Sequence, residues 1–227
     1  MAQPGQSLQL VLSLPHTESF AREDFIAGPS NAAALSLVDR WPDWPDRVVA
    51  LIGPEGSGKS HLASIWAEKT GARILSARAL DGASVIDALS TGALVIENLV
   101  PPQVDEIALF HLLNLVREER AHLLVTSRSL PATWPIALRD LMSRLRALPV
   151  VTVTPPDDAL LQALMMKLAA DRQIDLDPAL LSYLVQRLER SFSAVRSAIV
   201  ALDREALRQK RPISRALAAE LFRDDAA

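Results

Sequence analysis

The sequence predicts an α/β protein with a doubly wound parallel sheet of five strands, followed by a small all-helical domain. Three observations favour this fold class. Short apolar runs alternate with helical patterns over about two thirds of the chain, a glycine-rich loop follows the first run, and only helical patterns remain after residue 156. We therefore expect a flexible tail over residues 1–22, an α/β domain over 23–155 and a helical lid domain over 156–227.

Five short apolar runs are typical of buried parallel strands, because a strand that is covered on both faces shows no polar alternation. They span residues 48–52, 73–75, 93–96, 122–126 and 150–153. Helical patterns separate them, notably over 104–120 and 137–146. Before the first run, Ser30 or Asn31 is placed to cap a helix that ends near Arg40.

The lid is predicted from capping residues. Helices are expected to begin at Asp157 or Asp158, at Asp177 with Pro178 in the first helical position, at Ser191 or Ser193, and at Ser214. These starts divide the last 70 or so residues into short helices, which is typical of a small domain packed after a sheet.

Composition excludes several classes of protein. The chain has no cysteine, which excludes a disulfide framework and any thiolate site and fits a reducing compartment. Its formal charge of −3 argues against binding nucleic acid through bulk positive charge. No apolar window reaches the roughly 18 residues of a membrane helix, and the first residues make a poor signal peptide. We expect a cytoplasmic protein without membrane contacts.

Residues 53–60 read Gly-Pro-Glu-Gly-Ser-Gly-Lys-Ser, between a predicted strand and a predicted helix. In this context the pattern is a P-loop, whose backbone N–H groups surround phosphates while the lysine reaches the β- and γ-phosphates and the serine hydroxyl ligates Mg²⁺. A chance glycine-rich turn is the alternative. We expect ATP or ADP with Mg²⁺, held by Pro54, Glu55, Gly56, Ser57, Gly58, Lys59, Ser60 and His61.

A P-loop site also needs an acidic residue at the end of a buried strand to hold Mg²⁺. Glu97, which ends the run 93–97, is the candidate for this metal and catalytic role; the alternative is an ordinary residue at a strand end. Asn98 stands where a carboxylate that activates water is usual. Because an amide cannot accept a proton from water, we expect weak intrinsic ATP hydrolysis.

In this order, the pieces resemble the AAA+ ATPases, and within them the nucleotide-binding module of the bacterial replication initiator DnaA, over nearly the whole chain after Glu23. The resemblance implies four further roles. They are adenine contacts from Phe25, Ile26 and Asn31, a polar sensor at 126–128, an arginine finger at Arg144 and a second sensor at Arg196. Arg128 departs from the family, where an acidic residue is common. The alternative for Arg144 and Arg196 is a solvated helix face.

The short tail makes the chain similar to the Hda family of DnaA regulators. In that family a glutamine-leucine motif docks on the sliding clamp of DNA polymerase, and Gln9, Leu10 and Leu12 fit the motif without its usual closing aromatic residue. An edge strand or packed arm is the alternative reading of these residues.

The resemblance implies a repressor of chromosomal replication initiation. It would dock on the clamp, associate with the nucleoid through it, and promote hydrolysis of DnaA-bound ATP through Arg144. A homodimer or head-to-tail oligomer is plausible, and sequence-specific DNA binding is not expected. The alternatives are a helicase-loader-like AAA+ ATPase that acts on single-stranded DNA, and an adaptor that binds nucleotide only structurally.

Overall fold

Five parallel strands form the centre of the first domain, in the order β2-β3-β4-β1-β5. In this computed structural model, which describes residues 20–81, 84–100 and 104–222, the strands are β1 Val48–Ile52, β2 Arg73–Ser76, β3 Ala93–Glu97, β4 His122–Ser127 and β5 Val150–Thr152. All four pairings are parallel. The predicted fold class is confirmed, and each predicted strand lies within a residue of its observed ends.

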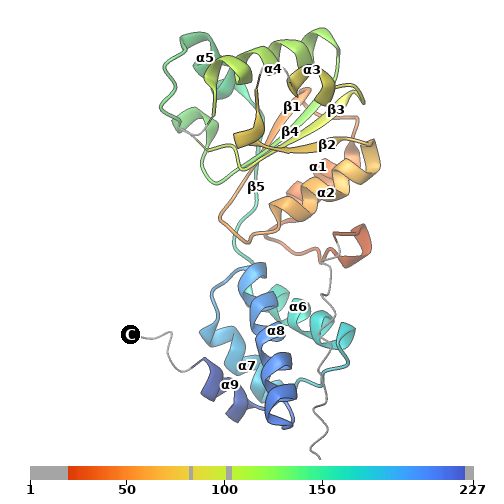
Figure 1. The fold of residues 1–227 in the computed structure, drawn as a ribbon, viewed down its shortest axis with the longest axis vertical. Helices are drawn as coiled ribbons and strands as arrows, with labels where there is room; N and C mark the ends of the chain where they lie inside the picture. Colours follow the sequence, from red (N-terminus) through yellow and green to blue (C-terminus); the bar gives the residue numbers. More distant parts are fainter. Residues whose placement is uncertain (1–19, 82–83, 101–103, 223–227) are drawn as a thin grey trace, which may run out of the picture.

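Helices cover both faces of this sheet (Figure 1). Helices α1 Ala32–Arg40 and α2 Lys59–Thr70 lie on one face, and α3 Ser84–Ala88, α4 Glu106–Glu118 and α5 Arg139–Ala147 lie on the other. The central strands supply both cores: in β4, Leu123 and Val125 pack toward α4 while Leu124 packs toward α2. Two covered faces explain why the strands read as continuous apolar runs.

The lid consists of α6 Asp158–Asp171, α7 Pro178–Arg187, α8 Phe192–Gln209 and α9 Arg215–Leu221. It has a core of its own, and in Figure 1 it lies on the side of the sheet that carries α1 and α2. Among the described residues, none of the helices has the length and apolar character that crossing a membrane requires.

The lid helices begin at the capping residues that the sequence indicates. The side chains of Asp157, Asp177, Ser191 and Ser214 each accept a hydrogen bond from the backbone N–H three residues further on. Where two residues were candidates, the structure selects Asp157 and Ser191.

Replacing Asp177 by alanine should lower the free energy of unfolding by about 1 kcal/mol, because an N–H at the start of α7 loses its acceptor. In the structure Asp177 Oδ1 accepts the N–H of Leu180 at 2.7 Å. Urea denaturation followed by circular dichroism measures the change. Asp175→Ala, at an exposed position two residues earlier, is the control and should have little effect; equal losses in the two variants would contradict the capping role.

Candidate functional site

A cavity of about 410 Å³ lies between the sheet domain and the lid. It is built by the entry segment before α1, the P-loop, the first turn of α2, the residues after β3 and β4, and the lid helices α6 and α8. Of the nucleotide ligands predicted from the sequence, its lining contains Phe25, Ile26, Glu55, Gly56, Ser57, Gly58, Lys59, Ser60, His61 and Arg196. The structure therefore brings together segments that are up to about 170 residues apart in the chain.

Sheet topology delivers one end of this cavity. The strands β1, β4 and β3 are parallel neighbours, so their carboxyl ends meet at one edge, which is where α/β sheets bind ligands. The P-loop follows β1, Asn98 follows β3 and Arg128 follows β4, and all three line the cavity. The N–H of Asn98 donates to Thr126 Oγ1 at 3.1 Å, which ties the ends of β3 and β4 together.

The P-loop turns through two glycines in the left-handed region, Gly56 with φ 67° and Gly58 with φ 94°. Gly58 is followed directly by α2, whose N-terminus opens on the cavity. Unpaired N–H groups and the positive end of the helix dipole attract an anion at that point.

The lid rests directly on this loop. The N–H of Phe192 donates to the carbonyl oxygen of Gly56 at 2.8 Å. A Cβ at residue 56 would lie 2.2 Å from Ser193 Oγ and 2.9 Å from Ser191 Cβ, so only glycine permits the observed approach. The loop that would hold phosphate is therefore also a joint between the two domains.

Lys59 is only 7% exposed, and its ammonium lies inside the P-loop. Nζ donates to the carbonyl oxygens of Gly53 at 2.8 Å and Pro54 at 2.7 Å. Burial lowers the pKa of Lys59 and Arg128 lowers it further, while Glu55 and Glu97 act in the opposite direction. Pro54 itself is outside the lining, and its carbonyl positions the lysine.

The predicted metal ligands are only partly gathered. Ser60 lines the cavity, whereas Glu97 is half-buried behind it, with an Oε1 that is buried and has no hydrogen-bond partner in the described part of the chain. A hydroxyl and an unpaired carboxylate oxygen are donors that Mg²⁺ accepts, and Mg²⁺ commonly takes its remaining ligands from phosphate and water. Within the same residues, no three His, Cys, Asp or Glu side chains form a metal cluster.

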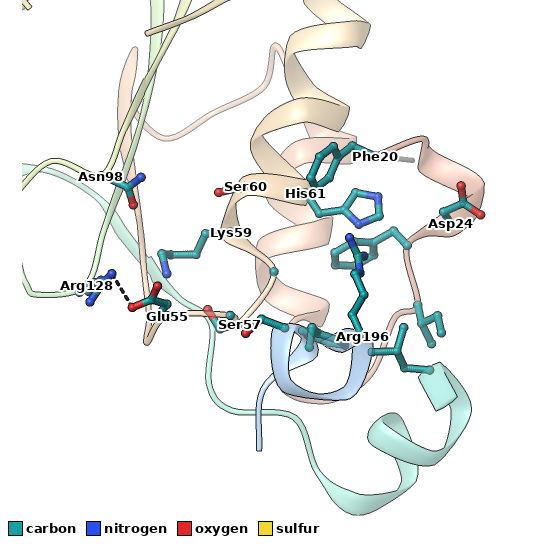
Figure 2. Close-up of a pocket in the computed structure, with 17 residues that line it drawn as sticks. Phe20, Asp24, Glu55, Ser57, Lys59, Ser60, His61, Asn98, Arg128 and Arg196 are labelled. Carbon is teal, nitrogen blue, oxygen red and sulfur yellow. Dashed lines mark ion pairs between the residues drawn. The ribbon is translucent and has the colours of Figure 1, made fainter. Parts of the chain in front are cut away.

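The opposite end of the cavity is aromatic (Figure 2). The His61 ring lies edge to face between Phe20, with centroids 5.4 Å apart, and Phe25, with centroids 5.2 Å apart. His61 Nε2 is 2.9 Å from the carbonyl oxygen of Ala21, so a neutral imidazole with its proton on Nε2 donates there. Burial lowers the pKa of His61, and the nearby Arg196 lowers it further. This end offers flat apolar surfaces suited to a nucleobase.

Asn31 is placed next to the site without lining it. It occupies the N-cap position of α1, but its buried side chain makes no capping hydrogen bond. Instead Oδ1 accepts the N–H of Gly28 at 2.9 Å, and Nδ2 donates to the carbonyl oxygen of Ile26 at 3.0 Å. Asn31 therefore holds the backbone of the entry segment that carries Phe25 and Ile26.

Other lining residues were not predicted as ligands. They are Phe20, Asp24, Asn98, Arg128, Leu164, Phe192 and Ser193. Phe192 and Ser193 adjoin the segment that carries Arg196, and Arg128 ends the predicted sensor, so proximity in sequence was the available signal. Nothing in the local sequence indicates that Phe20 or Leu164 reaches the cavity.

Arg144 lies on α5, away from this cavity. Nη1 donates to Asn114 Oδ1 at 2.5 Å, and the guanidinium lies over the Phe110 ring at 4.7 Å from its centroid. The carboxylate of Glu106 accepts the N–H groups of Ala137 and Leu138 at the start of α5. Helix α4 thus holds both the start of α5 and its arginine. The tail residues Gln9, Leu10 and Leu12 lie outside the described residues.

Compared by sequence, the chain matches no protein-family model and none of the curated proteins. Compared by structure, it is similar to domain III of the Thermotoga maritima replication initiation protein DnaA, with TM-score 0.73, 18% identity and coverage of 90% of this chain and 96% of that one. Replication initiator DnaA bound to AMPPCP and single-stranded DNA matches with TM-score 0.66 and 17% identity, over 84% of this chain and 68% of that one.

The Thermotoga maritima Holliday junction branch migration motor RuvB matches with TM-score 0.69 and 16% identity, over 90% of this chain and 72% of that one. The chain therefore has the fold of the AAA+ ATPases DnaA and RuvB, with its sheet domain and lid both inside the matched region.

Gly56→Ala should abolish measurable nucleotide binding, because the new methyl group overlaps Ser193 and forces the lid away from the loop. Fluorescence anisotropy of a labelled adenine nucleotide measures this. Gly71→Ala is the matched control: Gly71 also has positive φ, but a Cβ there meets nothing within 4 Å. That variant should lose about 1 kcal/mol of stability from backbone strain and still bind nucleotide. Normal binding by folded Gly56→Ala would contradict the assigned contact.

Acidification should destabilise the fold, and His61 should account for part of the loss. The folded-state pKa of His61 lies below its ordinary 6.5, so below pH 6.5 the unfolded chain takes up a proton that the folded chain resists. Stability is therefore retained above pH 6.5 and falls as the pH drops through the lowered pKa. Thermal denaturation between pH 7.5 and 5.0 should show a smaller loss for His61→Gln than for the parent.

His111→Gln, at an exposed position on α4, is the control for this pH series and should behave as the parent does. The buried His122, whose pKa is also lowered, contributes the remaining dependence. An identical pH profile for the parent and His61→Gln would rule out the assigned role.

Proposed function

We propose that this protein is a nucleotide-gated regulator of replication initiation that binds ATP or ADP with Mg²⁺ and acts on a DnaA-type partner. The observation that carries the proposal is the meeting of the P-loop and the lid at Gly56 and Phe192, beside a cavity whose two ends suit phosphates and a base. A ligand in that cavity touches both domains, so its presence biases how they face one another.

The residues at the phosphate end bind rather than react. Lys59 and the N-terminus of α2 supply positive charge, and Ser60 with Glu97 would hold Mg²⁺, which neutralises phosphate charge when bound. Asn98 lines this end, and its amide cannot take a proton from water. This arrangement supports tight binding with slow intrinsic hydrolysis.

Arg144 would act on the partner. It lies on α5, away from this chain's own cavity, and its contacts with Asn114 and Phe110 hold the guanidinium in one orientation. A cation presented in this way would stabilise charge on the γ-phosphate of ATP bound to a neighbouring DnaA. Arginine fingers supplied in trans accelerate hydrolysis by about 10³–10⁵-fold.

The tail would supply the second contact. Gln9, Leu10 and Leu12 would dock on the sliding clamp, and this tether would raise the local concentration of the regulator near DnaA without new contacts between the two. Association with the nucleoid would follow from the clamp.

The second candidate is a helicase-loader-like ATPase that acts on single-stranded DNA. It is favoured by the similarity to a DnaA structure that holds AMPPCP and single-stranded DNA. The amide of Asn98 and the formal charge of −3 count against it. Strong intrinsic ATP hydrolysis stimulated by single strands would select this function over the regulator.

The regulator should stimulate hydrolysis of ATP bound to DnaA when clamp-loaded DNA is present, and Arg144→Ala should remove the stimulation while the protein stays folded. Release of labelled phosphate from preloaded DnaA measures the rate. Arg139→Ala, an exposed arginine on the same helix, is the control and should retain the effect. Equal stimulation by Arg144→Ala and the parent would exclude the finger, and Gln9→Ala that still binds the clamp would exclude the tail contact.

A further inference from the structure

An ion pair joins two elements at the phosphate end of the cavity. Arg128, which follows β4, places Nη2 at 2.5 Å from Oε2 of Glu55 in the P-loop, and both residues line the cavity. Figure 2 shows the pair beside Lys59 and Asn98, at the end opposite His61 and Phe20. The cation and the carboxylate therefore meet where a phosphate would be bound.

This pair is poorly suited to a structural role. The two side chains are 56% and 72% exposed, and water screens the attraction between such charges, so the pair contributes little to stability. For the same reason little is lost when the arginine changes partner. A guanidinium presents a planar fork of N–H donors that matches phosphate oxygens as well as it matches a carboxylate.

The electrostatics of Lys59 show that both members of the pair act on the phosphate site. Arg128 lowers the pKa of Lys59 and Glu55 raises it, so both charges lie within reach of that buried ammonium. Lys59 and Arg128 together form a dicationic site, and the Glu55 carboxylate is the anion that this site attracts in the absence of phosphate.

Resting on the nucleotide binding proposed above, we infer that Arg128 is a phosphate-binding residue that exchanges Glu55 for the terminal phosphate of a nucleoside triphosphate. In Figure 2 Arg128 lies beyond Lys59 as seen from His61, so it meets the phosphate farthest from the base. Glu55 competes with that phosphate for the arginine. The pair thereby sets the preference of the site for a triphosphate over a diphosphate.

The two members of the pair should have opposite effects on affinity. Arg128→Gln should weaken ATP binding about tenfold, which corresponds to the loss of one charge-assisted contact. The same variant should change ADP affinity less than about twofold, because the terminal phosphate is missing. Glu55→Gln should tighten ATP binding several-fold, because it removes the competing carboxylate and its repulsion of phosphate.

The test is isothermal titration of the full chain with ATP and with ADP, in the presence of Mg²⁺, for the parent and the two variants. Arg190→Gln is the matched control, because Arg190 pairs with Asp158 on the lid at 2.9 Å with similar exposure, 57% and 54%, and does not line the cavity. It should bind both nucleotides as the parent does. Melting temperatures of all variants should stay close to that of the parent.

The outcomes separate this inference from the function on which it rests. Opposite shifts for Arg128→Gln and Glu55→Gln, confined to ATP, support the exchange. Unchanged binding in both variants, or parallel weakening of ATP and ADP in both, overturns it while leaving nucleotide binding intact. A folded parent protein that binds neither nucleotide overturns the proposed function itself.

Discussion

The P-loop and the first turn of α8 meet backbone to backbone: the carbonyl oxygen of Gly56 accepts the N–H of Phe192, and a side chain at residue 56 would overlap Ser193. The loop must turn tightly between β1 and α2, and it must also seat the lid. Both demands fall on the same few backbone atoms. A ligand that orders this loop therefore acts on the relative position of the two domains.

The charges around the cavity follow from its position at the carboxyl edge of the sheet. Three neighbouring strands end there and deliver Lys59, Asn98 and Arg128, while Glu55 reaches in from the loop. Two cations and an amide favour an anion without offering a base for water. The opposite end, lined by Phe20, Phe25 and Phe192, has no such charges and suits a flat apolar group. The site is thus divided into a charged end and an aromatic end.

On the other face of the sheet, α4 organises α5. The Glu106 carboxylate satisfies two N–H groups at the start of α5, and Asn114 and Phe110 hold Arg144 one turn or more further along. An arginine held at both its charged group and its flat face keeps one orientation at low entropic cost on binding. This arrangement is consistent with a surface that presents a fixed cation to a partner.

The sequence by itself determined the elements: buried strands read as apolar runs, the P-loop pattern marked the turn after β1, and Asp157, Asp177, Ser191 and Ser214 marked the starts of the lid helices. These features depend on local patterns of burial, turn and capping. Only the tertiary structure decided that Asn31 braces the entry segment, that Phe192 meets the loop and that Arg128 pairs with Glu55. Such contacts join residues far apart in the chain, and their partners are set by how the sheet and lid pack.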